Sequence, residues 1–150
     1  MPDVQVIGVD LGGTAIKLAR IRADGTVMAE AQCSTPQPAL PGAVTMALCE
    51  AIEQIDPGHA AQAVGVGLPG PMDASARVAR VCINLPGWED VPLADWLESR
   101  INRQVTLAND GNCAVVGEAW LGAARGVEDV VLLTLGTGVG CGVILRGELF

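Results

Sequence analysis

The chain is poor in aromatic residues, with three tryptophans, one phenylalanine and no tyrosine in 150 residues. Half of the residues are hydrophobic and 17% are charged, so the core must be built from aliphatic side chains. Such a composition suits an α/β protein better than an aromatic-rich β-sandwich. Nine basic residues stand against seventeen acidic ones, the formal charge is -8, and no run of Lys or Arg occurs. This surface repels phosphate backbones, which argues against a nucleic-acid partner.

The sequence also lacks an export signal, a membrane-spanning stretch and a cysteine pattern typical of metal binding. The N-terminus lacks a basic region followed by a long apolar run, which predicts no signal peptide. No stretch approaches the roughly twenty apolar residues that a membrane helix needs. The cysteines are widely spaced without a Cys-x-x-Cys pair, which favours a reducing compartment over disulfides or a zinc site; they are Cys33, Cys49, Cys82, Cys113 and Cys141. We therefore expect a cytoplasmic protein without membrane contact, in which Cys49 and Cys113 act as small helical hydrophobes.

The stretch Val4 to Lys17 reads as strand, glycine turn and strand. Gly12 and Gly13 let the backbone turn sharply and bring its N–H groups close to an anion. Asp10 ends the first strand, where a carboxylate suits a hydrated magnesium ion, while Thr14 adds a hydroxyl and Lys17 follows on the return strand. The alternative is an ordinary hairpin whose Asp and Gly residues only make the turn.

Along the chain, hydrophobic periodicity predicts one domain with an antiparallel three-strand meander, followed by helices and short strands. The helix expected over 43–55 places Val44, Leu48, Ile52 and Ile55 on one face, and Trp96 is expected in the core from a helix over 92–103. His59 falls in a loop and is assigned no role. The remaining predicted strands cover 14–21, 26–34, 63–68, 77–83, 104–108, 130–135 and 143–145, and a third helix covers 113–124.

Two further features concern chemistry. Asp110 lies between a strand and a helix, where it can cap the helix or, aimed into a crevice, accept a proton from a substrate hydroxyl; on the residues alone, capping is favoured.

The glycine-rich run 136–142 then repeats the opening hairpin, with Thr137 in the turn. Two such turns suggest two loops that grip one polyphosphate, and the alternative is a hairpin that packs tightly against a neighbour.

Together these motifs resemble the ROK family of bacterial sugar kinases and sugar-responsive repressors. The resemblance rests on Asp10-Leu11-Gly12-Gly13-Thr14 with Lys17, Gly67-Leu68-Pro69-Gly70, Asn84-Leu85-Pro86-Gly87-Trp88, Asn109-Asp110-Gly111-Asn112 with Gly117-Glu118, and residues 133–140. It covers nearly the whole chain, and Cys141 stands where glycine is expected. It implies an actin-like, ribonuclease-H-like ATPase fold: a mixed sheet that opens with the meander and has flanking helices on both faces.

The resemblance also implies roles. ATP phosphates would contact Asp10, Gly12, Gly13, Thr14, Lys17, Thr137 and Gly138, with magnesium held by Asp10 through water. The sugar would lie against Gly67, Gly70, Asn84, Asn109 and Asp110, with Asp110 as the catalytic base. The implied reaction is ATP-dependent phosphorylation of a hexose at its primary hydroxyl, glucose above all. The alternatives are a ROK-type transcriptional regulator and a non-catalytic sugar-binding lobe.

By the same resemblance, residues 1–150 form the amino-terminal lobe. The family's carboxy-terminal lobe, with its zinc motif, lies beyond the second glycine turn. We therefore expect the isolated chain to have little or no kinase activity, since one lobe cannot close on its substrates. Dimers are common in the family, so a homodimer is a further expectation.

Overall fold

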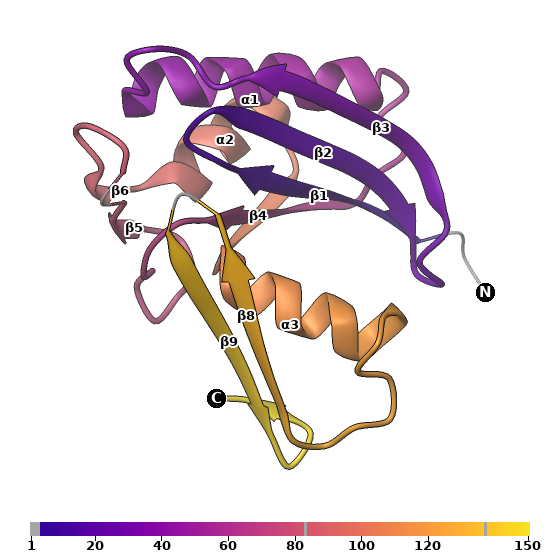
Figure 1. Ribbon diagram of the computed structural model, residues 1–150. Coiled ribbons are helices and arrows are strands. Elements are labelled where there is room, and N and C mark those ends of the chain that lie inside the picture. Colours follow the sequence, from indigo (N-terminus) through magenta and orange to yellow (C-terminus); the bar gives the residue numbers. More distant parts are fainter. Residues whose placement is uncertain (1–3, 83, 137) are drawn as a thin grey trace. The chain divides into compact units, whose positions relative to one another are not determined.

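The computed structural model describes residues 4–82, 84–136 and 138–150 (Figure 1). The chain divides into two compact units, of which the first ends at Ala108 and the second is Asn109–Phe150. Among the described residues, no disulfide is present, and no helix is both long and apolar enough to cross a membrane.

The first unit is built on a five-stranded sheet in the order β3-β2-β1-β4-β7. The chain enters through an antiparallel meander, and β4 then pairs with β1 in parallel. The sheet is therefore mixed and opens with three antiparallel strands, as the sequence predicts. Its strands are β1 (Gln5–Leu11), β2 (Ala15–Arg22), β3 (Val27–Ser34), β4 (Ala63–Leu68) and β7 (Gln104–Asn109); a separate pair consists of β5 (Ala79–Val81) and β6 (Glu89–Val91).

Two helices cover one side of this sheet, α1 (Pro41–Ile55) and α2 (Leu93–Ile101) (Figure 1). They contact each other, and α1 also packs on β2 and β3. Alternate residues of β1 point into the resulting core, where Ile7, Val9 and Leu11 are buried. All four apolar residues predicted for the inner face of α1 are buried, each contributing roughly 1.5–3 kcal/mol before entropy is counted. The helix begins two residues earlier than expected because Pro41 occupies its first turn, where a missing N–H costs nothing.

The second unit consists of α3 (Asp110–Leu121) and a three-stranded antiparallel sheet in the order β10-β9-β8. These strands are β8 (Val130–Leu135), β9 (Val139–Leu145) and β10 (Glu148–Leu149). The expected return strand over 143–145 is thus too short, since β9 already begins at Val139. Only residues 136–138 are left for the turn.

Two expectations about single side chains need correction. Trp96 is only partly buried at the edge of the core, whereas Trp88 is 2% exposed and its indole Nε1 donates to the carbonyl of Ala39 at 2.8 Å. Cys113 is exposed rather than a packed hydrophobe; Cys49 does pack against the core. Within α2 the buried positions are Leu93, Ala94, Leu97 and Ile101, so Trp96 lies at the border of the buried face rather than at its centre.

A buried carboxylate links the end of α1 to the sheet. Asp56 is fully buried, and its oxygens accept from Nη1 of Arg20 at 2.9 Å and from the amides of Ala60 and Ala61 at 3.0 Å. Arg103 Nη2 lies 3.2 Å from the other side of the carboxylate. Burial alone would raise the pKa of Asp56, but the amides of Ala61 and Ala60 and the charge of Arg103 outweigh it and lower the pKa.

We predict that Asp56→Asn lowers the free energy of unfolding by about 3–5 kcal/mol, because it leaves two arginines without their buried counter-charge. The carboxylate's contribution is complete above its ordinary pKa of 3.8 and is lost as the pH falls through the lowered folded value. Urea unfolding at several pH values measures both effects. Asp90→Asn, which removes an exposed pair with Arg80, is the control and should change stability by less than about 1 kcal/mol. Equal losses in the two variants would contradict the assignment.

Candidate functional site

The first glycine turn lies where β1 ends, and strand pairing decides which residues surround it. Asp10 is opposite Lys17 on β2 and opposite Gly67 on β4. Asp10 and Lys17 are both exposed, on the sheet face opposite the buried stripe of β1. The pairing therefore brings three predicted site residues to one end of the sheet.

Each glycine of this turn has its own environment. The amide of Gly12 donates to the carbonyl of Ala15 at 3.0 Å, and a Cβ added at Gly12 would lie 2.9 Å from that oxygen. Gly12 thus shapes the turn and does not offer its N–H to a ligand. The amides of Gly13 and Thr14 have no acceptor among the described residues, and both residues are exposed. These two N–H groups are the ones an anion can reach.

Two residues that the sequence analysis missed hold the turn in place. The hydroxyl of Thr35 donates to the carbonyl of Gly12 at 2.6 Å, and the amide Nε2 of Gln37 donates to the carbonyl of Gly13 at 3.0 Å. Thr35 is buried and its own amide donates to Thr14. The signal was present in the meander, because continuing the β2–β3 register past Ser34 brings Thr35 beside the turn.

The other two loops expected to line a sugar site meet the same end of the sheet. A Cβ added at Gly70 would lie 1.9 Å from the carbonyl oxygen of Val81, so only glycine permits this approach. The loop after Val81 continues to Leu85, whose side chain lies within van der Waals distance of a Cβ built on Gly13. Asn84 is exposed in this loop, which Trp88 anchors to the connector before α1.

In the second unit, the residue that caps α3 is not the one expected from the sequence. The helix cap is Asn109, whose side-chain oxygen accepts from the amide of Asn112 at 3.1 Å. Asp110 is the first residue of α3 and is exposed, with Oδ1 accepting from the amide of Gly111 at 2.8 Å. The capping role favoured for Asp110 is therefore wrong. Its carboxylate is left facing solvent at the start of α3.

The glycines of the run 136–142 fall into two groups with different surroundings. A Cβ added at Gly142 would lie 2.3 Å from the carbonyl oxygen of Gly111, and one at Gly111 would lie 2.9 Å from that of Cys141. These glycines let the first turn of α3 lie directly on β9, which is the tight packing proposed as the alternative. Among the described glycines of this run, Gly136 and Gly138 have open space around them and remain candidates for a phosphate contact. Thr137 lies outside the described residues.

Within the second unit, the contact between Gly111 and Cys141 brings the start of α3 beside β9 near the glycine turn (Figure 1). Asp110 and Gly138 therefore belong to the same end of this unit. The convergence of the first and second glycine turns on one polyphosphate stays a prediction.

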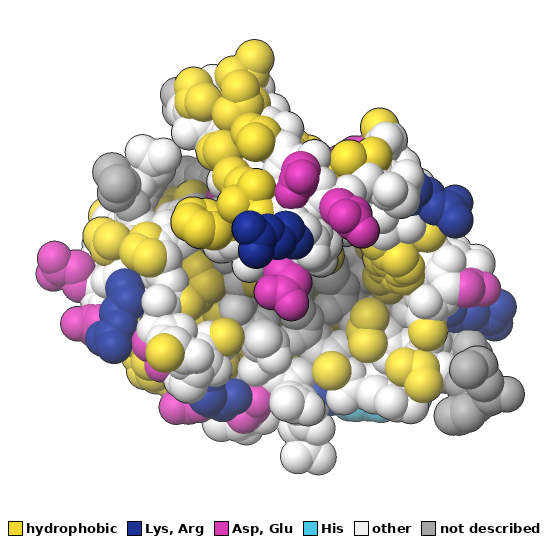
Figure 2. All heavy atoms as spheres, turned by 90° about the horizontal axis from the view of Figure 1, so that it is seen from below, with side chains coloured by type: hydrophobic (Ala, Val, Ile, Leu, Met, Phe, Trp, Pro, Cys, Tyr) yellow, Lys and Arg dark blue, Asp and Glu magenta, His cyan; other side chains and the backbone are white. Residues whose placement is uncertain are grey.

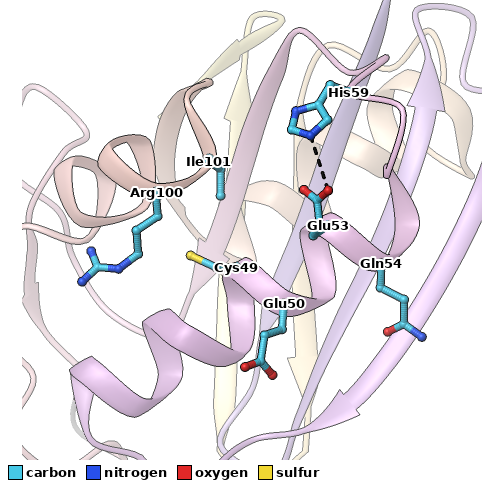
Figure 3. Close-up of a pocket in the computed structure, with 7 residues that line it drawn as sticks. All are labelled: Cys49, Glu50, Glu53, Gln54, His59, Arg100 and Ile101. Atoms are coloured by element: carbon cyan, nitrogen blue, oxygen red, sulfur yellow. Dashed lines mark ion pairs between the residues drawn. The ribbon is translucent and has the colours of Figure 1, made fainter.

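A shallow depression of about 550 Å³ lies elsewhere in the first unit, between α1, α2 and the loop that carries His59 (Figure 3). His59 Nε2 is 3.4 Å from Glu53 Oε1, but both side chains are more than half exposed, so the pair contributes little. Burial raises the pKa of the Cys49 thiol, which makes it a poor nucleophile. No predicted site residue lines this depression.

A mixed sheet that opens with an antiparallel meander, with a glycine turn after its first strand, belongs to the actin-like ATPase class of α/β proteins. The pattern of the ROK family matches residues 6–150, and the chain belongs to this family. It is 40% identical to a glucokinase of Thermotoga maritima over 99% of its own length and 47% of that protein's. The chain thus spans about half of such relatives.

Solved structures agree with this placement. A ROK family glucokinase from Streptomyces griseus, in complex with glucose and AMPPNP, superposes with a TM-score of 0.91 at 35% identity, over 97% of this chain and 46% of that one. An inorganic polyphosphate/ATP-glucomannokinase from Arthrobacter sp. strain KM gives 0.88 at 31% identity, over 98% and 60%.

We predict that Thr35→Val loosens the first glycine turn, because it removes the hydroxyl that binds the carbonyl of Gly12. The expected loss is about 1 kcal/mol in the free energy of unfolding, with faster amide hydrogen exchange at Gly13 and Thr14. Thr106→Val, at an exposed position of β7, is the matched control and should leave the exchange at the turn unchanged. An unchanged turn in Thr35→Val would show that the hydrogen bond does not hold it.

We also predict that Gly142→Ala destabilises the second unit by roughly 1–3 kcal/mol, because the new methyl group is forced against the backbone of Gly111. Gly117→Ala is the control: it lies within α3 with open space around it and should be neutral or stabilising by up to about 1 kcal/mol. Thermal unfolding followed by circular dichroism distinguishes the two. A neutral Gly142→Ala would mean that α3 does not pack on β9 at this position.

Proposed function

We propose that this protein provides the amino-terminal lobe of an ATP-dependent hexose kinase, which transfers a phosphoryl group to the primary hydroxyl of glucose. The proposal rests on the different positions of Asn109 and Asp110 at the start of α3. Because Asn109 caps α3, the Asp110 carboxylate is left exposed at the end of a strand, as a proton acceptor must be. The similarity to glucokinases supports glucose as the sugar.

The first turn fits a polyphosphate with magnesium. The exposed amides of Gly13 and Thr14 are anion donors, and Lys17 adds a positive charge on the neighbouring strand. No group of three or more His, Cys, Asp or Glu among the described residues could form a metal cage. This agrees with magnesium, which keeps most of its waters and needs only one or two carboxylates besides the phosphates, here Asp10. When bound, the ion neutralises charge on the phosphoryl oxygens.

The sugar would lie against the loops 67–70 and 82–88 and against Asn109. The proximity of Gly70 to Val81 and of Leu85 to Gly13 supports this arrangement, because transfer would require the two substrates to lie next to each other. Asn109, whose Oδ1 accepts from the amide of Asn112, would contact the sugar at the start of α3. Gly138, and Thr137 outside the described residues, would contact ATP from the second turn.

The proposal also includes the compartment, the second lobe and the oligomeric state. We propose a cytoplasmic enzyme of glucose metabolism that is complete only with a carboxy-terminal lobe, and that forms a homodimer. The kinase is favoured over the regulator alternative, because the similarity to glucokinases is higher than that to a ROK family transcriptional regulator, and the formal charge of -8 opposes contact with DNA.

The test uses this chain extended by the carboxy-terminal half of the Thermotoga maritima glucokinase. In that protein, Asp110→Asn should retain sugar binding and lower the rate of phosphoryl transfer by roughly 10²–10⁴-fold, because the substrate hydroxyl loses its proton acceptor. A coupled assay for ADP release with glucose, mannose, fructose and N-acetylglucosamine measures activity and the preferred sugar.

Glu118→Gln in the same protein is the control, since this carboxylate lies in the last part of α3 and accepts from the amide of Ala123. It should keep its activity. Retained turnover in Asp110→Asn would remove the base assignment, and full activity of the unextended 150 residues would refute the need for a second lobe.

A further inference from the structure

The connector that joins β3 to α1 binds the first glycine turn at three successive backbone carbonyls. The hydroxyl of Thr35 donates to the carbonyl of Gly12 at 2.6 Å, and the amide of Thr35 donates to that of Thr14 at 2.9 Å. Between these two bonds, Nε2 of Gln37 donates to the carbonyl of Gly13 at 3.0 Å. The connector therefore holds every carbonyl of the turn from Gly12 to Thr14.

Each of these bonds also orients an N–H group, because a peptide unit is planar. In a trans peptide, the carbonyl of one residue and the N–H of the next lie in one plane and point in opposite directions. The peptides of the turn are trans. The carbonyl of Gly12 thus fixes the N–H of Gly13, and the carbonyl of Gly13 fixes the N–H of Thr14. Both N–H groups point away from the connector, and they are the two that an anion can reach.

The connector is stiff, because proline follows each of its anchoring residues. Thr35 and Gln37 both precede a proline, and so does Leu40 at the start of α1. Proline fixes its own φ and restricts the residue before it to extended backbone. Leu40 has this conformation, with φ -69° and ψ 144°. A side chain on such a segment has little freedom to move relative to its neighbours.

The other end of the connector is bound to the loop that follows β5. Nε1 of Trp88 donates to the carbonyl of Ala39 at 2.8 Å, and both residues are 2% exposed. The same loop contacts the turn directly, since Leu85 Cδ2 lies 3.9 Å from a Cβ built on Gly13. The loop proposed to line the sugar and the turn proposed to hold phosphate therefore share one support.

The direction of these N–H groups matters because the chain offers an anion little general attraction. The formal charge is -8. On the face shown in Figure 2, the dark blue Lys and Arg side chains lie apart from one another, with magenta Asp and Glu side chains among them, and form no basic patch. Lys17, the cation near the turn, is paired across the strands with Asp10. Binding of a polyphosphate then depends on well-aimed hydrogen bonds rather than on a field of positive charge.

We propose that Thr35 and Gln37 are positioning residues, which aim the N–H groups of Gly13 and Thr14 at phosphoryl oxygens, and that Trp88 holds this arrangement from the neighbouring loop. Both residues act through the backbone and not by contact with the anion. The pairing is specific: Thr35 sets the N–H of Gly13, and Gln37 sets the N–H of Thr14. The inference rests on the proposed function, because it takes the anion at the turn to be a polyphosphate.

The pairing can be tested on the 150-residue chain without a ligand. Residual dipolar couplings of the isotope-labelled protein report the direction of each N–H bond. Gln37→Met removes the donor at similar side-chain size and should change the coupling of Thr14 more than that of Gly13, whereas Thr35→Val should do the reverse. Gln54→Met, at an exposed position of α1, is the matched control and should change neither. Equal couplings in all variants would overturn the positioning role.

A titration with magnesium and inorganic tripolyphosphate then tests binding, with the amide signals of Gly13 and Thr14 as the readout. Gln37→Met should weaken the affinity by about 2- to 10-fold, the worth of one hydrogen bond. Trp88→Phe should weaken it too, although this side chain belongs to the neighbouring loop, because the connector loses its anchor. Trp96→Phe is the control and should bind as the unchanged chain does. Full affinity in Gln37→Met, or no shift at the two amides, would overturn the proposal.

A kinetic measurement separates this inference from the proposed function. In the chain extended by the carboxy-terminal half of the Thermotoga maritima glucokinase, Gln37→Met should raise the KM for ATP several-fold and leave the KM for glucose unchanged. An unchanged KM for ATP in an active protein would contradict the positioning role. Tripolyphosphate binding that depends on Gln37, in a protein that phosphorylates no sugar, would instead refute the proposed function and support the positioning role.

Discussion

The double pairing of β1 is the constraint on which the first unit depends. This strand is antiparallel to β2 on one side and parallel to β4 on the other, so Asp10 has fixed neighbours in Lys17 and Gly67. Side chains alternate between the two faces of a strand. A slip of one residue would therefore send Asp10 into the core and Ile7, Val9 and Leu11 into solvent. The free energy of the aliphatic core thus holds the register, and the register fixes the position of the first glycine turn.

The glycines of the candidate site motifs look alike in sequence but meet different structural demands. Gly12, Gly70, Gly111 and Gly142 are required because another segment's backbone lies where a side chain would start. Gly13, Gly136 and Gly138 have little or nothing near them, so packing does not require glycine there, and the predicted ligand contact is the remaining explanation. Close packing and ligand access are separate uses of the same residue, and a motif alone does not distinguish them.

Much of the fold could be predicted because hydrophobic periodicity is strong in these strands and helices: β4 and β8 have the bounds expected from the sequence. The features that could not be predicted belong to loops and connectors, which have no hydrophobic periodicity. Trp88 is buried from a loop, and Thr35 and Gln37 act on the glycine turn from a connector. Residue preference narrowed the cap of α3 to Asn or Asp but could not choose between Asn109 and Asp110, because the choice depends on where the helix begins. The motifs that resemble the ROK family supplied the candidate site residues, and the geometry shows that Asn109 caps α3 while Asp110 is exposed. Their roles toward a substrate stay predictions.

The alternating apolar residues of β1 (Ile7, Val9 and Leu11) and of β8 (Val131, Leu133 and Leu135) show a further limit of prediction from sequence. An alternating strand specifies which face must be buried, but it does not specify what buries it. In the first unit the chain itself supplies α1 and α2, and the stripe of β1 closes into a core. In the second unit an equally apolar stripe on β8 is 61–81% exposed. Because two nearly identical patterns have opposite exposures, the difference lies in the surrounding segments and not in the strand.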